Sequence, residues 1–390
     1  MVTDFTSKSF PSGLKRFQKN ADRNKTNSST KPVEAMSQFQ SEIQATDTPV
    51  AALESLLKSL SHSNLFIITD SNVEREVLPM FADFIAEREV KVITIPAGEE
   101  HKNLSTLTDI WQQLSENGAT RHSIIINIGG GVVSDIGGFA ASTFKRGIRY
   151  INIPTTVLAA VDASCGGKTG IDFNGLKNEI GAYWPPEVVI MSSIFYKTLP
   201  EVQVLSGFAE IVKMAMISSR GIYSEVLSGR ISPHGPTILA DMRRCADEKL
   251  RIADIDPYEV GLRKVLNFGH TCGHAFESML LKRGQGVTHG EAVAHGILVA
   301  LILSHMILEL PCTEIHNYRK LILRKYFQKL PVTADDADEL IRLMGRDKKN
   351  TKSGEFNFVL ISEPGGPRFD IVVTEEQIRT ALTIYLEMQN

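Results

Sequence analysis

The residues from Ile124 to Asp135, which read IIINIGGGVVSD, decide the fold. A short apolar run predicts a buried strand, and the glycines after it predict a tight turn into a helix. Glycines at such a turn let backbone amides approach a phosphate closely, and the helix N-terminus adds partial positive charge. The spacing differs from the GxGxxG fingerprint, so the turn alone leaves a dinucleotide site and a plain tight turn equally open.

Further apolar runs flank this stretch on both sides. We predict buried strands at residues 65–69, 90–95, 124–128, 151–153 and 188–191, and helices at 51–60 and 104–114. Strands that alternate with helices predict a mostly parallel sheet with helices on both faces. Ligands bind such sheets at the carboxyl ends of the strands, and the glycine turn lies at one of these ends.

Helical spacing dominates beyond about residue 205. We predict helices at residues 204–218, 238–255, 268–281, 291–308, 316–327 and 335–344, with one strand-like run at 356–361. The fold class is therefore α/β plus all-α: a Rossmann-like, parallel-sheet domain at 35–203 that binds a nucleotide, and a helical domain at 204–390 that binds metal and substrate. Residues 1–34 are rich in Lys, Ser, Thr and Asn, so we predict a disordered tail there.

The composition excludes several classes of function. A formal net charge of -3 provides no basic field for nucleic acid or for a membrane surface. The four cysteines form no CxxC pair, which argues against a disulfide framework and a thiolate zinc site and favours the cytosol. The uncharged run between Glu291 and Glu309 approaches the length of a membrane span, but a buried helix is the better interpretation.

A second group of polar residues suggests an anionic ligand. It comprises Thr155, Thr156, Asp162, the loop Gly166-Gly167-Lys168-Thr169-Gly170 and the pair Lys177-Asn178. Lysines supply charge and glycines allow close approach, although a solvated loop is the alternative. Gly167-Lys168-Thr169 resembles the end of a P-loop, but Asp162 stands where that motif needs a glycine, which excludes it.

Histidines form a third group, in Gly269-His270-Thr271-Cys272-Gly273-His274 and His289-Gly290-Glu291. On a helix, His270 and His274 lie at i and i+4 and share one face. With His289 and a carboxylate such as Glu210, they would form an open metal site of nitrogen and oxygen ligands. A single histidine is more often a satisfied core residue, but three so close together favour a metal.

A further polar cluster lies just ahead of the histidines and comprises Lys249, Glu259, Arg263 and Asn267. Arg263 could bind a carboxylate through two parallel hydrogen bonds. For Lys249, a solvated helix face is the competing interpretation.

The segment from about 65 to 365 resembles the dehydroquinate synthases, within the sugar phosphate cyclases. The resemblance rests on motifs that occur in the family's order: GGGVVSD, FKRG, IPTT, GGKTG, LKNEIGA, GFAEIVK, LNFGHTCGH and HGEAVA. It implies that Glu210, His270 and His289 bind one divalent metal, zinc or cobalt. It also implies that His274 lies near the substrate phosphate instead of on the metal.

The resemblance implies further roles. The residues implied for NAD are Asp70, Glu99, Lys102, Gly130, Gly131, Val132, Val133, Ser134, Asp135, Thr155, Thr156, Lys168, Lys177, Phe195 and Thr198. The residues implied for the phosphate and leaving group are Lys168, Asn178, Asn267, His274 and Lys348. Lys249 and Arg263 would hold a carboxylate, with Asp162 and Lys213 on hydroxyl groups. Arg146 would reach the neighbouring subunit's site, which implies a homodimer.

The implied activity closes 3-deoxy-D-arabino-heptulosonate 7-phosphate into 3-dehydroquinate and phosphate, with NAD reduced and regenerated. Three alternatives remain at this point. The chain could be a cyclase that makes an inosose or a valiolone, a metal-dependent polyol dehydrogenase, or a nucleotide-binding regulator without activity. The pairing of Lys249 with Arg263 favours a substrate that carries a carboxylate, and the three metal ligands argue against a regulator.

Overall fold

The computed structural model describes residues 41–174, 176–345 and 356–389. The predicted tail at residues 1–34 and Lys348, which was predicted to bind the substrate phosphate, both lie outside the described residues.

The first part of the described chain builds a six-stranded sheet with the order β1-β8-β5-β4-β2-β3. Its strands are β1 (Glu42–Ala45), β2 (Leu65–Asp70), β3 (Lys91–Ile95), β4 (Ile124–Gly129), β5 (Arg149–Pro154) and β8 (Val188–Met191). Every pair of neighbours in this sheet is parallel. The predicted parallel sheet is therefore confirmed, and β1 is a strand that the sequence analysis missed.

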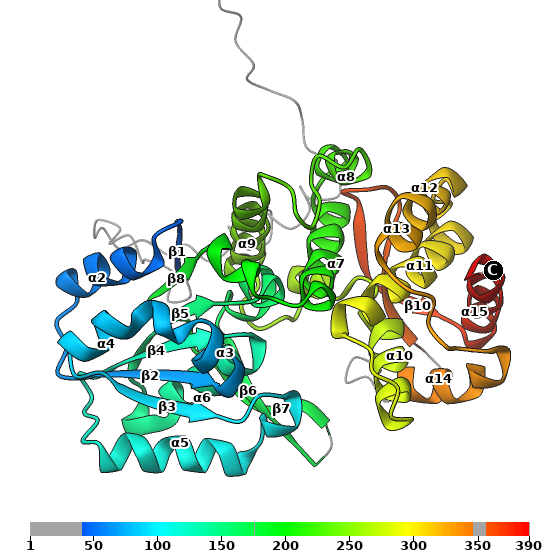
Figure 1. Cartoon of the computed structure of the whole chain (residues 1–390). Helices are drawn as coiled ribbons and strands as arrows, with labels where there is room; N and C mark the ends of the chain where they lie inside the picture. The colour runs from blue at the N-terminus through cyan, green and yellow to red at the C-terminus, as the bar shows by residue number, and fades with distance from the viewer. Residues whose placement is uncertain (1–40, 175, 346–355, 390) are drawn as a thin grey trace, which may run out of the picture. The chain divides into compact units, whose positions relative to one another are not determined.

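Helices cover both faces of this sheet (Figure 1). They are α2 (Pro49–Ser59), α3 (Ser71–Glu76), α4 (Ala82–Glu87), α5 (Leu104–Glu116) and α6 (Gly131–Thr143). Strand β4 explains the layers, because Ile124, Ile126 and Ile128 pack with residues of α2, α3 and α4. Ile125 points the other way and packs with residues of α5 and α6. Side chains alternate along a strand, so a fully apolar strand can be buried on both faces.

The strand order reverses beside β4. Strands β2 and β3 lie on one side of β4, while β5, β8 and β1 lie on the other. Loops that leave neighbouring strands in opposite directions open a crevice at the carboxyl ends of those strands. Here these ends are Asp70 on β2 and Gly129 on β4, so the glycine turn lies beside the switch point.

The segment around Lys168 is a β-hairpin, and its prediction as glycine-rich loops was wrong. Strands β6 (Lys168–Phe173) and β7 (Leu176–Tyr183) pair in antiparallel fashion. Gly170 and Gly181 face each other across this ladder, where a Cβ on Gly181 would lie 2.2 Å from the carbonyl oxygen of Thr169. These glycines serve close backbone approach within a sheet and do not mark a loop.

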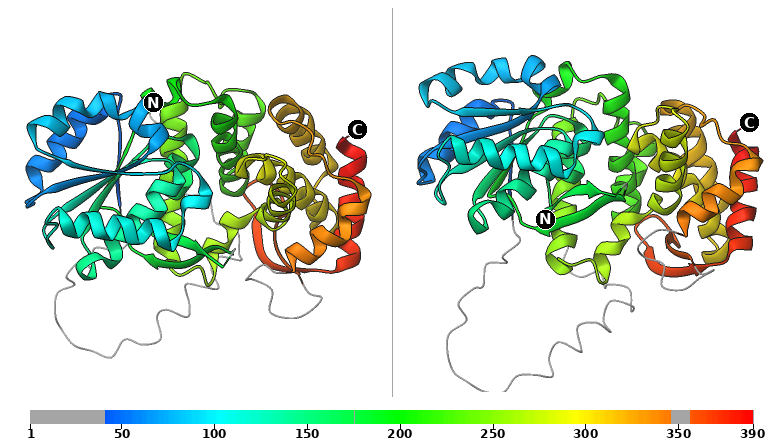
Figure 2. Two further views of the ribbon diagram at one scale, coloured as in Figure 1. Left: turned by 60° about the horizontal axis from the view of Figure 1, so that its bottom comes forward. Right: turned by 90° about the horizontal axis from the view of Figure 1, so that it is seen from below.

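The second part of the described chain is mainly helical. Its elements are α7 (Glu201–Ser218), α8 (Arg220–Leu227), α9 (Ile238–Ile255), α10 (His270–Lys282), α11 (His289–Leu308), α12 (Cys312–Tyr318), α13 (Arg324–Tyr326), α14 (Ala337–Met344), β9 (Phe356–Ile361), β10 (Pro367–Val373) and α15 (Glu375–Gln389). Short 3-10 or π turns lie at Leu78–Phe81, Glu99–His101, Phe144–Arg146, Ala159–Ala163, Ser193–Lys197, Leu262–Asn267, Arg319–Leu323 and Ala334–Asp336. Both hairpin β9–β10 and helix α15 pack against α11 (Figures 1 and 2).

Two predictions for this part were wrong. The helix predicted at 316–327 is broken, because α12 ends at Tyr318 and a π turn follows. The strand at 356–361 is not alone, since β10 pairs with it around an irregularity between Arg368 and Ile371. Asp370 has a positive φ of 57° at this irregularity. The bulge interrupts the alternation from which a strand is predicted.

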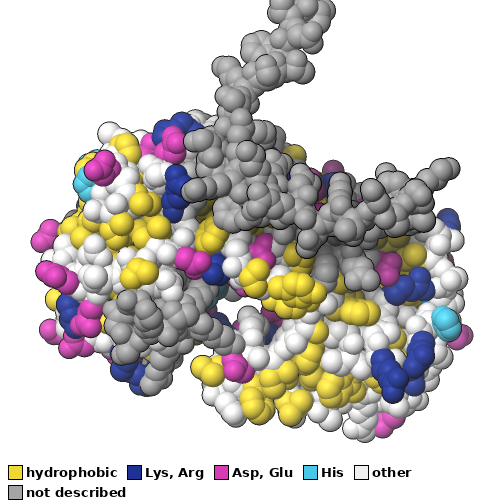
Figure 3. Space-filling view, turned by 180° about the vertical axis from the view of Figure 1, so that it is seen from behind, with side chains coloured by type: hydrophobic (Ala, Val, Ile, Leu, Met, Phe, Trp, Pro, Cys, Tyr) yellow, Lys and Arg dark blue, Asp and Glu magenta, His cyan; other side chains and the backbone are white. Residues whose placement is uncertain are grey.

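Helix α11 is the core of the helical part. Among the described residues, it is the one helix whose length and hydropathy would allow a membrane span, and 72% of its most apolar window is buried inside the protein. The predicted buried helix is therefore confirmed. On the face shown in Figure 3, hydrophobic side chains form several patches and charged side chains of both signs are scattered between them.

Candidate active site

Glu210 is an acid in the middle of the buried face of α7, with 2% of its surface exposed. Its Oε2 forms an ion pair with Lys213, one turn further along the same helix. Its Oε1 is buried and makes no hydrogen bond of ordinary geometry with any described residue. Burial alone would raise the pKa of Glu210, but Lys213 and His289 outweigh it and lower the pKa to about 2. The carboxylate is therefore ionised, and one of its oxygens makes no hydrogen bond with a described residue.

Two imidazoles face Oε1 of Glu210. Nε2 of His270 lies 3.5 Å from Oε1 of Glu210, and Nε2 of His289 lies 3.7 Å from it. Each ring is held at its other nitrogen: Nδ1 of His270 donates to the carbonyl of Phe268 at 3.1 Å, and Nδ1 of His289 donates to Glu277 at 3.3 Å. The two Nε2 atoms and Oε1 therefore converge, as the ligand set of a divalent metal requires.

The two histidines differ in charge. Burial, together with the charge of Lys213, lowers the pKa of His270 and keeps its ring neutral. Burial also acts on His289, but its contacts with Glu210 and Glu277 outweigh that effect and raise the pKa to about 9. A metal that binds His289 would have to displace a proton, so binding should be pH-dependent.

His274 lies beside the same cluster. Its ring centroid lies 5.2 Å from that of His270 and 5.7 Å from that of His289, and the potential ligand atoms of the three rings lie within 4.8 Å of one another. The geometry is therefore compatible both with a metal on all three histidines and with His274 next to the metal.

Glycines bring the three helices of this site together. A Cβ on Gly290 would lie 1.9 Å from the carbonyl oxygen of Ser206, so only glycine lets α11 approach α7 this closely. Similarly, a Cβ on Gly296 would lie 2.2 Å from the carbonyl oxygen of Gly269, at the start of α10. The convergence of Glu210, His270 and His289 depends on these approaches.

A second buried cluster centres on Lys102, which is 3% exposed. Its Nζ lies 2.9 Å from Glu99, 2.9 Å from the amide oxygen of Asn178, 3.3 Å from Asp135 and 3.5 Å from Asp172. Burial raises the pKa of Asp135 to about 6, in spite of the charge of Lys102. The structure thus brings together three residues predicted for NAD: Glu99, Lys102 and Asp135.

Asn178 was predicted to contact the phosphate, but it bonds to Lys102 in this structure. Its backbone φ of 51° is positive, and its N–H donates to the side chain of Asp172 at 2.8 Å. The structure therefore groups Asn178 with the residues predicted for NAD and not with Lys168 and Asn267.

The glycine turn has the predicted geometry. Strand β4 ends at Gly129, Gly130 caps helix α6, and the N–H of Thr155 donates to the carbonyl of Gly129 at 2.9 Å. A Cβ on Gly130 would lie 3.2 Å from the methyl group of Thr156. Residues of the turn and the two threonines therefore adjoin one another.

The other residues predicted for NAD have structural contacts of their own. Val133 is buried beneath Gly129, Ser134 bonds back to the carbonyl of Gly130, and one oxygen of Asp70 caps helix α3. Phe195 packs in the core, with its ring 6.5 Å from that of Phe81, and Thr198 bonds to the carbonyl of Phe195. Gly131 and Val132 lie in the first turn of α6.

Lys249 and Arg263 both lie close to Gly166. A Cβ on Gly166 would lie 3.0 Å from a guanidinium nitrogen of Arg263 and 3.7 Å from Cε of Lys249. Lys249 donates to Asp162 at 2.5 Å. Burial alone would raise the pKa of Asp162, but Lys249 and Lys213 lower it to about 2. Two buried cations therefore adjoin each other, with an ionised acid beside them.

Lys168 and Asn267 are connected through Glu259. The ammonium of Lys168 pairs with one oxygen of Glu259, and the amide of Asn267 donates to the other at 2.6 Å. Glu259 has a positive φ of 58°, which non-glycine residues adopt at a cost. This carboxylate bonds to two of the groups that were predicted to hold the substrate phosphate.

Glu277 is buried, with 5% of its surface exposed, and was not among the predicted site residues. It contacts His289 from helix α10 and also accepts from Lys177 of β7 at 2.9 Å. The sequence does indicate this position, because residues 270, 274 and 277 stand at i, i+4 and i+7, on one helical face.

Two family models match the chain: 3-dehydroquinate synthase N-terminal over residues 92–206, and 3-dehydroquinate synthase C-terminal over residues 207–350. The chain belongs to the 3-dehydroquinate synthase family. A 3-dehydroquinate synthase of Parabacteroides distasonis is 42% identical over 336 residues, which are 86% of this chain and 95% of that protein.

Two solved structures of related cyclases have the same fold as this member of the 3-dehydroquinate synthase family. One is a 2-deoxy-scyllo-inosose synthase complexed with carbaglucose-6-phosphate, NAD+ and Co2+, with a TM-score of 0.78, 25% identity and coverage of 88% of this chain and 96% of that one. The other is ValA, a 2-epi-5-epi-valiolone synthase from Streptomyces hygroscopicus subsp. jinggangensis 5008 with NAD+ and Zn2+ bound, with a TM-score of 0.76, 26% identity and coverage of 93% and 99%.

Arg146 lies apart from the clusters described above. It is exposed, and its guanidinium pairs with none of the described residues. The backbone around it is unusual, because Lys145, Arg146 and Gly147 have φ values of 50°, 71° and 104°. Positive φ at two consecutive non-glycine residues is often found at functional sites. In this 3-dehydroquinate synthase family member, Arg146 therefore combines an exposed side chain with an unusual backbone conformation.

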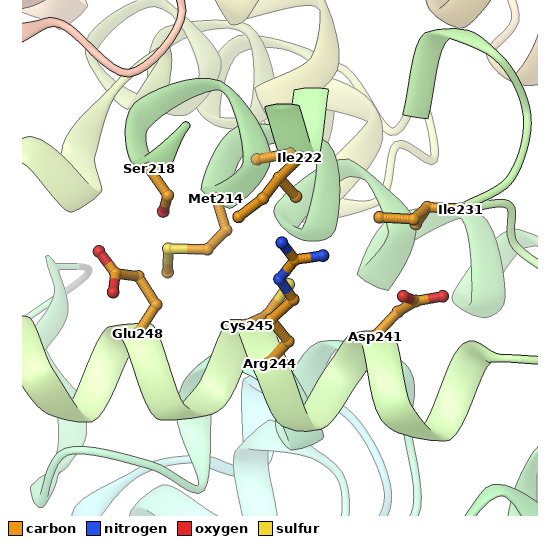
Figure 4. Close-up of a pocket in the computed structure, with 9 residues that line it drawn as sticks. Met214, Ser218, Ile222, Ile231, Asp241, Arg244, Cys245 and Glu248 are labelled. Atoms are coloured by element: carbon orange, nitrogen blue, oxygen red, sulfur yellow. The ribbon is translucent and has the colours of Figure 1, made fainter. Parts of the chain in front are cut away.

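A small cavity lies elsewhere, between α7, α8 and α9, with room for about one water molecule. Figure 4 shows its lining, in which Met214 and Ser218 face Cys245 and Glu248 across the cavity. The hydroxyl of Ser218 is buried there without a partner among the described residues. A single bound water would satisfy this hydroxyl. A cavity with room for about one water molecule is too small for the substrate.

Proposed function

We propose that this protein is a 3-dehydroquinate synthase that converts 3-deoxy-D-arabino-heptulosonate 7-phosphate into 3-dehydroquinate and phosphate. The family membership and the 42% identity with a relative of that name support the proposal. We also propose that the chain uses NAD and one divalent metal, zinc or cobalt. The two cyclase structures, which hold NAD+ with Co2+ or Zn2+, support these cofactors.

One observation carries the proposal: Oε1 of Glu210, which makes no hydrogen bond with any described residue, faces Nε2 of both His270 and His289. An ionised, buried carboxylate oxygen that has only long contacts with two imidazoles and no hydrogen bond is incompletely satisfied, and a metal cation bound between these groups would satisfy it. The donor set of one oxygen and two imidazole nitrogens suits zinc or cobalt and leaves a position open for substrate. A bound metal would supply Lewis acidity to a substrate hydroxyl.

The crevice beside β2 and β4 suits NAD. A pyrophosphate there would meet the backbone amides of the glycine turn and the positive end of helix α6. The Lys102 cluster and Lys177, whose Nζ is 3.8 Å from Glu99, would flank the rest of the cofactor. A bound nicotinamide would accept a hydride and return it in the same catalytic cycle.

The substrate's two anionic ends match two groups of cations. Lys249 and Arg263 would hold the carboxylate, while Asp162 and Lys213 would contact hydroxyl groups beside it. The phosphate would bind Lys168, Asn267 and His274, together with Asn178 and Lys348. To do so it would have to displace Glu259, which now pairs with Lys168 and Asn267.

The main alternatives are cyclases that make an inosose or a valiolone. Their substrates carry no carboxylate, so Asp162 would be the one anion beside the two adjoining cations Lys249 and Arg263 among the groups described above. The substrate of a polyol dehydrogenase carries no phosphate group, so Lys168 and Asn267 would have none to bind.

The test offers purified protein with NAD and Zn2+ or Co2+ three substrates in separate reactions: the heptulosonate phosphate, sedoheptulose 7-phosphate and glucose 6-phosphate. We expect phosphate release from the first alone, without net NADH. Phosphate release from either of the other two would instead support a valiolone or inosose synthase. Net NADH from a simple polyol would support a dehydrogenase.

We further propose that the protein is a cytoplasmic homodimer in which Arg146 completes the neighbouring site. The exposed Arg146 supports this arrangement, as do the exposed apolar side chains on and beside the β6–β7 hairpin: Phe173, Leu176, Ile180, Tyr183 and Trp184. Trp184 packs against Gly147, next to Arg146. A division into domains at 203/204 is also proposed, and the two family models, which meet at 206 and 207, support it.

Mixed dimers test the role of Arg146. Arg146→Ala and His270→Ala should each be inactive alone. Mixed after dissociation, they should regain about a quarter of the wild-type activity, because half of the dimers are mixed and each holds one complete site. If Arg146 acts within its own subunit, mixing restores nothing.

A further inference from the structure

Glu277 lies between the candidate metal site and the β6–β7 hairpin. It is on the same face of α10 as His270 and His274, with 5% of its surface exposed. Its Oε2 accepts from Nδ1 of His289 at 3.3 Å, and its Oε1 accepts from Nζ of Lys177 at 2.9 Å. One buried carboxylate thus contacts a predicted metal ligand and a predicted cofactor residue, with a different oxygen for each.

We propose that Glu277 is a positioning residue that holds His289 for the metal with one oxygen and Lys177 for the cofactor with the other. The inference rests on the proposed function, because it takes both partners from the proposed metal and NAD sites.

The contact with His289 fixes which nitrogen is free. An acceptor at Nδ1 holds the proton there, directs Nε2 toward Oε1 of Glu210, and makes the ring a stronger ligand. His270 receives the same support from the backbone carbonyl of Phe268. A backbone carbonyl cannot be removed by substitution, so Glu277 is the support that an experiment can reach.

The contact with Lys177 holds a side chain that is otherwise loosely placed. Lys177 lies on β7, and 45% of its side chain is exposed. Its other acidic neighbour, Glu99, is 3.8 Å away, against 2.9 Å for Glu277. Among the described acids it contacts, Glu277 is therefore the closer and the more buried, and a buried acceptor holds an ammonium group more strongly than an exposed one.

A purely structural ion pair is the competing explanation, and a matched control distinguishes it. Glu314 is 8% exposed, lies on a helix and pairs with Arg220 at 3.0 Å, but contacts none of the site residues. Glu314→Gln therefore removes a buried carboxylate like that of Glu277 from a half-exposed cation, Arg220, that resembles Lys177 in exposure.

The experiment titrates Co2+ into metal-free full-length protein and follows the visible absorption of the bound ion. We expect Glu277→Ala to bind Co2+ about 10–100-fold more weakly and to change the absorption spectrum. Glu277→Gln, whose amide oxygen can still accept from Nδ1, should show a smaller loss. Glu314→Gln should match the wild type in affinity and spectrum.

Lys177→Met separates the two contacts. It leaves the bond between Glu277 and His289 in place, so its Co2+ affinity should stay within about threefold of the wild type, while NAD should bind more weakly. Glu277→Ala should weaken both Co2+ and NAD. A loss of Co2+ affinity in Lys177→Met equal to that in Glu277→Ala would overturn the role of Nδ1.

The outcomes separate this inference from the proposed function. If the wild type itself does not bind Co2+, the proposed metal site fails. If the wild type binds Co2+ and both Glu277 variants bind it equally well with the same spectrum, only the role of Glu277 fails. Should Glu277→Ala not fold, Glu277→Gln against Glu314→Gln decides the question.

Discussion

The protein buries two ionic clusters that differ in one respect. Around Lys102, the ammonium has four oxygen partners within 3.5 Å, which come from Glu99, Asp135, Asp172 and Asn178. Around Glu210, one carboxylate oxygen pairs with Lys213, while the other makes no hydrogen bond of ordinary geometry with any described residue. The first cluster is complete within the chain and the second is not.

This difference indicates what each cluster is for. Buried polar groups in native proteins almost always have partners, so an exception needs an explanation. A completed cluster stabilises the arrangement of the segments that it joins, whereas an incomplete one can bind a ligand that completes it. We therefore expect substitutions at Glu210 to cost mainly function, and substitutions at Lys102 to cost stability in addition to any contact that its cluster makes with the cofactor.

The largest expected effect is on turnover, from Glu210→Gln. The amide keeps the shape of the side chain but lacks the charge that would hold a metal. A Lewis acid contributes several kcal/mol to the transition state, so a loss of about 4 kcal/mol lowers kcat by about a thousandfold. The free energy of unfolding should fall by only about 1–2 kcal/mol, since the amide oxygen can still accept from Lys213.

Phosphate release measures the turnover and urea denaturation measures the stability. Glu314→Gln is again the control. Wild-type turnover in metal-loaded Glu210→Gln would remove Glu210 from the site, and a loss of stability above about 3 kcal/mol would make its cluster structural like that of Lys102.

The two clusters also differed in how far the sequence predicts them. Metal ligands on one helix have a fixed spacing, so His270 and His274 could be grouped from i and i+4, and Glu277 could have been added at i+7. The partners of Lys102 come from segments far apart in the chain, including Asp172 and Asn178 of the β6–β7 hairpin. No spacing in the sequence indicates such a meeting.

The fold shows the same limit. Long apolar runs such as β4 and α11 were predicted because they are buried on all sides. The β6–β7 hairpin was not, because its glycines resemble loop signals until the opposite strand is known. Helix α15 is a different case, since its buried residues Ile378, Ala381, Leu382 and Tyr385 have helical spacing that the sequence analysis did not use.

The second prediction concerns stability, through Lys102→Met. It would leave three acids, Glu99, Asp135 and Asp172, around a buried apolar side chain. Breaking a buried ion pair costs about 3–5 kcal/mol, so we expect a loss of that size at pH 8 in urea denaturation. Lys58→Met, at an exposed position on α2, should change stability by less than about 0.5 kcal/mol.

The pH dependence of Lys102→Met sharpens this test. Burial already raises the pKa of Asp135 to about 6, and removal of Lys102 would raise that pKa further. Protonation of Asp135 relieves the repulsion, so the deficit of the variant should shrink as the pH falls below 7. A deficit that is constant from pH 8 to pH 5 would contradict the assignment.

The smallest expected effect tests a third buried polar group, which is complete and uncharged. His295 is 1% exposed; its Nε2 donates to the carbonyl of Gln328 at 2.8 Å, and its Nδ1 accepts from the hydroxyl of Tyr385 at 2.8 Å. Because its polar atoms all have partners, we expect His295 to have a structural role: its bond to Tyr385 joins α15 to α11.

Burial lowers the pKa of His295 from 6.5 to about 4, so the folded protein binds this proton less well than the unfolded chain does. Its contribution to stability is therefore fully present above pH 6.5 and is lost as the pH falls toward 4, by about 3 kcal/mol in total. His295→Gln keeps a neutral donor and acceptor at every pH. Its unfolding free energy between pH 7 and pH 4.5 should consequently fall less steeply than that of the wild type, while Co2+ affinity at pH 7 stays unchanged. Parallel pH profiles for the two proteins would show that His295 is charged when folded, and a lost Co2+ affinity would mean that even a completed cluster on α11 acts on the metal site.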